Sequence, residues 1–213
     1  MTVSDLTGLL ANLTTPMAYL SALTGVLLLF GRDWRILLPI VLVQYGAVAV
    51  VLTESLSLPL AFSKLVVGVF VVLILYVTVR QLFAGGWMVA GETAESWLSW
   101  PMRLGVTVVL VIGCWWFAGQ AAGEQSLGYL FAGHGLVGLG VWGFVTTVRP
   151  LHIGLGVLMI LSGVELLILA GGESAIAAGF LAGAHLVTAV VVSYLAQTKP
   201  SESQKNVLSG ENA

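Results

Sequence analysis

Four ionisable side chains lie inside long apolar stretches of the sequence, and they are the residues best able to do chemistry there. Glu165 stands in the run GVLMILSGVELLILA, which holds no other charge. The other three are Lys64, His134 and His185. An ionisable group at membrane depth is costly, so by default it marks a transport pathway or a charged partner. The chemistry open to this set is the binding and release of protons within a membrane.

The positions of these four groups predict how they pair. At about 1.5 Å per residue of helix, all four fall between the outer face and the middle of a bilayer. Buried charges are usually paired, because a close opposite charge offsets the loss of solvation. We therefore predict a Lys64–Glu165 ion pair, and we interpret His134 and His185 as groups that hold or pass a proton. Four polar residues could extend this path: Gln44, Tyr45, Ser63 and Thr188.

A structural explanation of the same residues stays open. Lys64 could extend its aliphatic stem to the outer headgroups, and each histidine could make one helix-to-helix hydrogen bond. Glu165 is too deep and too short to reach the headgroups easily, so we expect it to have a partner. Whether that partner serves structure or transport is left open by the sequence.

The composition defines the setting of these residues. Of the 213 residues, 58% are hydrophobic and 8% are charged, whereas a soluble domain has about 25% charged residues. The mean hydropathy is +1.02. A spanning helix needs about 20 mostly apolar residues. We therefore predict an all-α integral membrane protein with seven transmembrane helices, at residues 16–31, 35–53, 59–80, 101–120, 127–148, 150–171 and 174–197.

The sequence predicts two membrane regions followed by a polar tail. Residues 1–100 form a three-helix membrane region that ends in an interfacial cytoplasmic loop at 81–100, and residues 101–198 form a four-helix region. The loop carries Trp87, Trp97 and Trp100, and tryptophan favours the headgroup level. Residues 199–213 are polar and are predicted to be a disordered cytoplasmic tail.

The basic residues indicate the orientation of the chain. Seven of the eight Lys and Arg residues fall in loops on one side, and the eighth is Lys64. The seven are Arg32, Arg35, Arg80, Arg103, Arg149, Lys199 and Lys205. The opposite loops hold Asp5, Glu54, Glu124 and Glu173. The positive-inside rule therefore places the N-terminus outside and the C-terminus in the cytoplasm.

Several familiar sites are not predicted. The pattern GxGxxG occurs at 133–138 and 138–143, but inside a spanning helix the backbone amides are already bonded and cannot hold a nucleotide. Close helix packing explains these glycines better, and likewise Gly179 and Gly183. Cys114 is the single cysteine, and a metal site would require the fold to bring His134 and His185 together. We therefore expect no catalytic site, no cofactor and no metal, and the scattered basic residues argue against nucleic acid.

The last three predicted helices resemble a known unit. His134 is followed by a basic loop at Arg149, and then by GLGVLMILSGVELLILA and AAGFLAGAHLVTAVVVSYLAQ. This arrangement resembles the three-helix unit of NuoK and MrpC, which are small membrane subunits of complex I and of multisubunit sodium/proton antiporters. Over most of the chain, RDWRILLPIVLVQYGAVAVVL and LAFSKLVVGVFVVLILYVTVRQL resemble the HyfE-type subunit of group 4 membrane-bound nickel–iron hydrogenases, including a lysine near the start of the third helix.

The resemblance implies a subunit in the membrane arm of a complex I-like assembly in a prokaryotic cytoplasmic membrane. Such a subunit contacts lipids and antiporter-like subunits, and it contributes to or supports the translocation of protons or cations. Two carboxylates expected from the resemblance are missing. One falls near Met159 to Leu161, one turn before Glu165, and the other near Gly183 to His185. Relocated carriers could restore the path; a purely structural scaffold and a self-contained small transporter or channel are the alternatives.

Overall fold

The described part of the chain forms seven α-helices. The computed structural model describes residues 3–31, 33–84, 99–121, 123, 126–147, 150–172 and 174–198. The helices are α1 (Val3–Phe30), α2 (Trp34–Leu52), α3 (Leu58–Ala84), α4 (Trp100–Ala121), α5 (Leu127–Thr146), α6 (Pro150–Leu169) and α7 (Ala175–Thr198). Each contains a stretch that is long and apolar enough to cross a membrane. The predicted all-α fold with seven helices of spanning length is confirmed.

Two helices extend several residues beyond a predicted boundary. Helix α1 begins at Val3 rather than at residue 16, with Pro16 inside it, and its membrane-length stretch is Asn12–Phe30. Residues 3–15 mix polar and apolar side chains, so hydropathy alone did not include them. Helix α3 continues to Ala84, so the first residues of the predicted 81–100 loop are helical. The rest of that loop up to residue 98 and the predicted tail at 199–213 lie outside the described residues.

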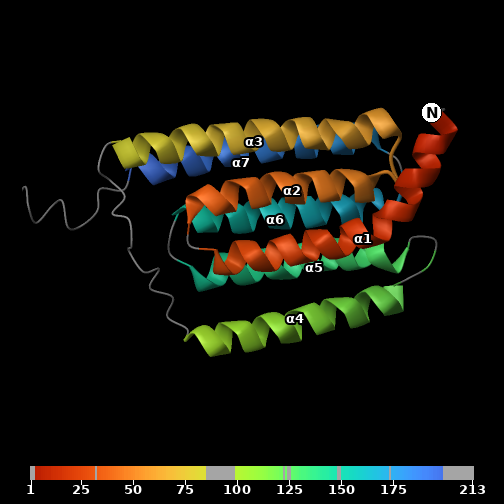
Figure 1. Ribbon diagram of the computed structural model, residues 1–213, viewed down its shortest axis with the longest axis horizontal. Helices are drawn as coiled ribbons and strands as arrows, with labels where there is room; N and C mark the ends of the chain where they lie inside the picture. Colours follow the sequence, from red (N-terminus) through yellow and green to blue (C-terminus); the bar gives the residue numbers. More distant parts are fainter. Residues whose placement is uncertain are drawn as a thin grey trace, which may run out of the picture.

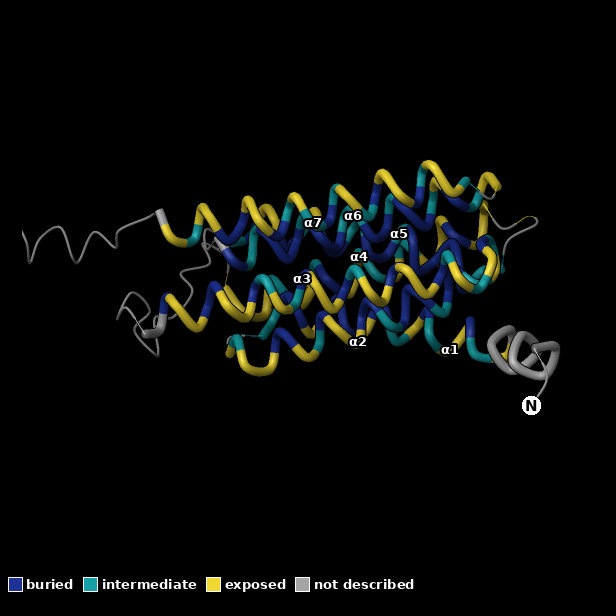
Figure 2. Tube along the Cα trace, turned by 90° about the horizontal axis from the view of Figure 1, so that it is seen from above, coloured by how far each residue is buried: buried dark blue, intermediate teal, exposed yellow. Residues whose placement is uncertain are grey.

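The helices form two layers of three, with α4 attached at one edge (Figure 1). Helices α1, α2 and α3 are neighbours in one layer, and α5, α6 and α7 are neighbours in the other. Helix α1 packs against α5 and α3 packs against α7, whereas α4 packs against α5. Figure 2 shows the buried residues facing inward, between the layers. The regions predicted at 1–100 and 101–198 therefore share one core.

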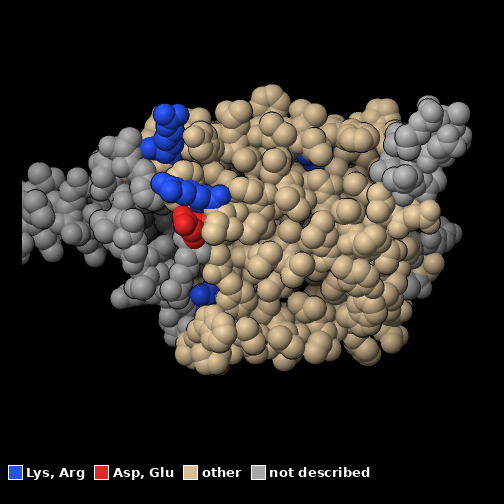
Figure 3. Space-filling model, in the orientation of Figure 1, with Lys and Arg blue, Asp and Glu red and all other residues tan. Residues whose placement is uncertain are grey.

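Successive helices run in opposite directions (Figure 1). Helices α1, α3, α5 and α7 begin at one end of the bundle, which we call the N-terminal end. Helices α2, α4 and α6 begin at the other, which we call the Arg-rich end because Arg35, Arg80 and Arg103 lie there. Nearly all the charge visible on the face in Figure 3 gathers at this end. The other four basic loop residues lie outside the described part of the chain: Arg32, Arg149, Lys199 and Lys205.

Polar contacts hold the end of α1 at the Arg-rich end. Arg103 Nη2 of α4 donates a hydrogen bond to the carbonyl oxygen of Leu29 over 2.9 Å. His152 Nε2 of α6 lies 3.0 Å from the carbonyl oxygen of Gly31. The last carbonyl groups of a helix lack partners within the helix. These two side chains supply partners and fasten α1 to α4 and α6.

Glycines allow the close approach of α5 and α6. A Cβ atom on Gly140 would lie 2.7 Å from the carbonyl oxygen of Gly156, and one on Gly163 would lie 2.6 Å from that of Gly133. Small residues let helix backbones approach in this way, so the packing role predicted for the α5 glycines is confirmed at Gly133 and Gly140, whereas a Cβ atom on Gly135 would meet nothing within 4 Å. Gly179 and Gly183 pack against no helix in the described part of the chain. Both are exposed, and a Cβ atom at either would meet none of the described residues within 4 Å.

Candidate functional site

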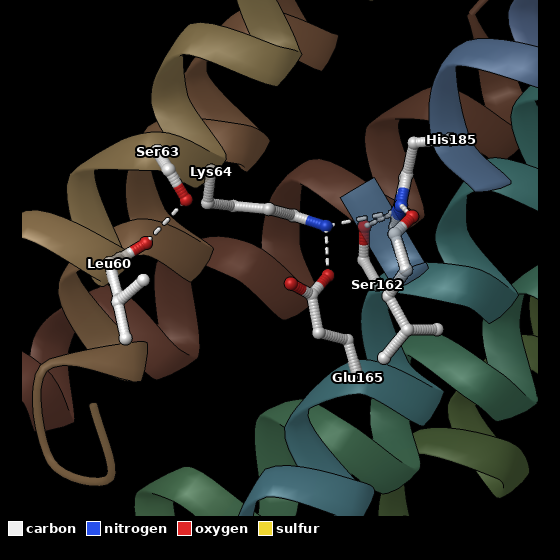
Figure 4. Close-up of polar contacts among 7 residues, drawn as sticks. Leu60, Ser63, Lys64, Ser162, Glu165 and His185 are labelled. Carbon is white, nitrogen blue, oxygen red and sulfur yellow. Dashed lines mark hydrogen bonds and ion pairs between the residues drawn. The ribbon is translucent and has the colours of Figure 1, made fainter. Parts of the chain in front are cut away.

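Three of the four predicted site residues meet inside the bundle (Figure 4). Lys64 Nζ of α3 forms a hydrogen bond and salt bridge with Glu165 Oε2 of α6. The same Nζ lies 3.0 Å from Nε2 of His185 on α7. The predicted Lys64–Glu165 ion pair is therefore confirmed. We call Lys64, Glu165 and His185 the triad.

The triad is buried among the helices. The exposed fractions of Lys64, Glu165 and His185 are 2%, 3% and 0%. The alternative that Lys64 reaches toward the headgroups is therefore wrong, because its ammonium turns into the bundle and meets a carboxylate. Close pairing of this kind offsets the cost of removing both charges from water.

The direction of the helices explains why the ion pair forms. Helix α3 begins at the end of the bundle where α6 finishes. Lys64 lies six residues after Leu58, and Glu165 lies four residues before Leu169, so both sit within about 9 Å of the N-terminal end at about 1.5 Å per residue. Glu165 is about one turn from the end of α6, which ends at Leu169 rather than at the predicted residue 171. His185 is deeper, ten residues after Ala175.

Ser162 is a fourth member of the site, which the sequence analysis missed. It lies one turn before Glu165 on α6, and its Oγ is 3.2 Å from Nε2 of His185. The three-residue spacing places Ser162 and Glu165 on the same side of the helix. The three-residue spacing from Glu165 could have identified Ser162 from the sequence. Serine is common in apolar helices, however, so its presence alone does not predict a site residue.

The contacts of His185 define its tautomer. Its Nδ1 lies 2.7 Å from the carbonyl oxygen of Leu181. A carbonyl only accepts hydrogen bonds, so Nδ1 carries the hydrogen, and Nε2 of a neutral ring is the acceptor. Nε2 therefore faces two donors, the Lys64 ammonium and the Ser162 hydroxyl.

We expect His185 at neutral pH to be uncharged with its hydrogen on Nδ1. Nitrogen-15 NMR of the histidine-labelled protein in a bilayer, with the spectrum of His185→Gln subtracted, measures this directly. The control is Ser162→Ala, which removes one donor to Nε2 but leaves the Leu181 carbonyl. It should move the Nε2 resonance without changing the tautomer. A hydrogen on Nε2 in the unmodified protein would contradict the assignment.

Tyr45 covers the triad on the side of α2. Its ring centroid is 5.0 Å from Lys64 Nζ and 5.6 Å from the His185 ring, which it meets edge-on. An ammonium beside an aromatic ring is attracted by the negative face of the ring. Gly68, one turn after Lys64, makes room for this contact, because a Cβ atom there would lie 2.5 Å from Tyr45 Cβ. Tyr45 thus packs directly against the groups whose path it was predicted to extend.

The other predicted residues do not contact the triad through a described hydrogen bond. His134 is half-buried on α5, and its Nδ1 lies 2.8 Å from the carbonyl oxygen of Leu130 in the same helix. Its backbone carbonyl, rather than its ring, links helices by accepting a hydrogen bond from Cys114 Sγ at 3.4 Å. Ser63 is exposed and bonds within α3, and Thr188 is half-buried. Within the described ranges, no group of three or more His, Cys, Asp or Glu side chains is placed to hold a metal ion.

Polar contacts also run from the N-terminal end toward the triad. The hydroxyl of Tyr129, a fully buried residue of α5, donates to the carbonyl oxygen of Leu166 over 3.0 Å. Ser126 Oγ accepts from the Tyr129 backbone N–H at 3.1 Å and donates to the carboxylate of Glu54 at 2.9 Å. Glu54 is exposed. A surface carboxylate is therefore tied, through two residues, to the helical turn that carries Glu165.

Compared with known proteins, the chain matches no protein-family model, no curated protein and no solved structure. The geometry of the site therefore carries the functional argument.

Proposed function

We propose that the protein is a non-catalytic subunit in the membrane arm of a complex I-like or membrane-bound hydrogenase-like complex, in which the triad takes part in proton or cation translocation. The observation that carries this proposal is the buried, hydrogen-bonded series Glu165, Lys64 and His185. Replacing a buried ion pair with apolar side chains of similar volume is often neutral or stabilising. Stability alone therefore does not account for the triad.

The hydrogen bonds of Lys64 with Glu165 and His185 support the following sequence of proton transfers. In the resting state Glu165 is negative, Lys64 is positive and His185 is neutral. A proton that reaches Glu165 neutralises the carboxylate and removes the counter-charge that holds the Lys64 ammonium. Lys64 then gives a proton to Nε2 of His185, which already accepts a hydrogen bond from it. The neutral amine recovers a proton from Glu165, so the net result is one proton moved from Glu165 to His185.

The orientation predicted from the basic loops gives this transfer a direction. With the N-terminal end outside, Glu54 lies at the outer surface and the Tyr129–Ser126 contacts lead from it toward Glu165. His185 lies about 15 Å along α7, which at 24 residues is about 36 Å long. The triad thus reaches less than halfway across the bundle. A path completed by neighbouring subunits suits this geometry better than a self-contained channel.

Membership of a larger complex can be tested first. The protein, tagged on its C-terminal tail and gently extracted from its own membrane, is examined by native mass spectrometry. Co-purifying antiporter-like and iron–sulfur subunits are the expected result. A lone monomer or a homo-oligomer would contradict the proposed membership and favour the self-contained transporter.

The proton role predicts the effect of Glu165→Gln. The amide can still accept a hydrogen bond from Lys64 but cannot take up a proton, so the complex should assemble while proton translocation falls about tenfold or more. Proton uptake by inverted membrane vesicles, driven by the complex's own electron donor, measures this effect. Ser63→Ala, an exposed change one residue from Lys64, is the control. Normal translocation by an assembled Glu165→Gln complex would refute the carrier role.

A further inference from the structure

We infer that the bundle binds a water molecule between α1, α2 and α6, beside the hydroxyl of Tyr45, and that this water continues the path from the triad toward the Arg-rich end. The water site stands on the structure alone. The route through it rests on the proposed function.

The first observation is the Tyr45 hydroxyl. The exposed fraction of Tyr45 is 2%, and its hydroxyl oxygen is buried without a hydrogen-bond partner among the described residues. Buried polar groups nearly always have a protein or water partner, because an unpaired one loses its solvation without compensation. The Ser162 side chain lies beside this hydroxyl but outside ordinary hydrogen-bond geometry. A water molecule would supply the partner that this hydroxyl lacks by strict hydrogen-bond geometry.

The second observation is a cavity where that partner fits. Its volume is about 10 Å³, close to the smallest volume that holds one water molecule. The lining residues are Leu28, Val41, Gln44, Tyr45, Leu155, Leu158 and Met159. A buried water needs two to four polar partners. The Tyr45 hydroxyl and the buried Gln44 amide supply both donors and acceptors, so the site suits water better than an apolar molecule.

The cavity lies where a proton path from the triad toward the Arg-rich end would continue. Helix α6 begins at the Arg-rich end, and Leu155, Leu158 and Met159 all precede Ser162. The cavity therefore lies on the Arg-rich side of the triad. Ser162 contacts His185 and lies beside the Tyr45 hydroxyl. The series from His185 to the water and Gln44 is therefore complete when the Ser162 and Tyr45 hydroxyl groups move into hydrogen-bond contact. Hydroxyl groups and water both donate and accept, so they can pass on a proton that His185 receives, while the Gln44 amide anchors the water.

X-ray radiolytic footprinting tests the water site in the intact complex or in the full chain in lipid nanodiscs. Hydroxyl radicals formed from a bound water oxidise the side chains that touch it, and Met159 lines the cavity. We expect Met159, although buried, to be oxidised several-fold faster in the unmodified protein than in Tyr45→Phe. Gln44→Met, which removes the other polar partner, should give the same decrease. The control is Tyr76→Phe, the same chemical change on a half-exposed tyrosine of α3, which should leave the rate unchanged.

Each outcome decides one part of the inference. Equally slow oxidation of Met159 in the unmodified protein and in both variants would overturn the water site. Slowed oxidation in Tyr45→Phe together with a several-fold fall in proton translocation supports both site and route. Slowed oxidation with normal translocation would overturn the route and keep the water site. Failure of the proposed function is recognised separately, by normal translocation in Glu165→Gln whatever the footprint of Met159.

Discussion

Replacing Glu165 with alanine should lower the free energy of unfolding by about 3–5 kcal/mol, because it leaves the ammonium of Lys64 buried without a counter-charge. His185 would remain within reach of Lys64, but a neutral ring cannot balance the charge. Thermal unfolding in mild detergent, followed by tryptophan fluorescence, should show a much lower Tm or little folded protein. Stability equal to that of the unmodified protein would mean that the pair is not held as ions.

The matching double variant separates charge from packing. Lys64→Met combined with Glu165→Leu removes both charges and keeps similar side-chain volumes, so most of the lost stability should return. The double variant should nevertheless fail to translocate protons. Arg80→Ala, which removes an exposed charge at the Arg-rich end, is the surface control and should change stability by no more than about 0.5 kcal/mol. Normal translocation by the double variant would leave the triad without a transport role.

Replacing Gly163 with alanine should destabilise the bundle by about 1–3 kcal/mol, because the added methyl group overpacks the contact between α5 and α6. The new Cβ atom would lie 2.6 Å from the carbonyl oxygen of Gly133 and 2.7 Å from the backbone nitrogen of Val137. Backbone atoms cannot move aside as a flexible side chain can, so the two helices must separate. Because Glu165 is two residues away on α6, the shift should also disturb its contact with Lys64. A lower Tm measures the first effect.

The same substitution on α7 provides the control. Gly183 is exposed, and a Cβ atom there would meet nothing within 4 Å. Gly183→Ala should therefore be neutral or stabilising by up to about 1 kcal/mol, since alanine favours the helix more than glycine does. Equal losses from Gly163→Ala and Gly183→Ala would show that the glycines act through helix propensity rather than through packing.

The contrast between Gly140 and Gly183 could not be predicted from the sequence. Both belong to small-residue patterns in apolar helices, and the pattern alone predicts close packing for both. The difference lies in which side of each helix faces a neighbour. Helix α5 turns Gly140 toward α6, whereas α7 turns Gly179 and Gly183 away from the other described helices. In a soluble protein polar residues would mark the outward side, but lipid and core are both apolar, so that signal is weak here.

The pairing of Lys64 with Glu165 was predictable because charged residues, unlike glycines, give a strong signal in an apolar sequence. The cost of an unpaired charge in hydrocarbon is large, and the chain offers few ionisable groups at the same depth. Depth follows from counting residues along a helix, so the sequence is enough to match the two. Ser162 and Tyr45 are uncharged, so their burial does not require an oppositely charged partner. Their place beside the triad depends on α2 facing α6 and on the space left by Gly68. Neither feature can be predicted by counting residues along a single helix.

Three features could be predicted from the residues of single helices, because each depends on how those residues are solvated: the number of spanning helices, the depth of the buried ionisable groups and the need of Glu165 for a partner. The lateral order of the helices, with α3 against α7 and α1 against α5, emerges only in the folded bundle. That order brings His185 to Lys64, leaves His134 apart from the triad, and places Tyr45 in the lining of a cavity. The physical reason is that lateral contacts depend on the shapes of several helices at once, whereas insertion in a membrane depends on each helix alone.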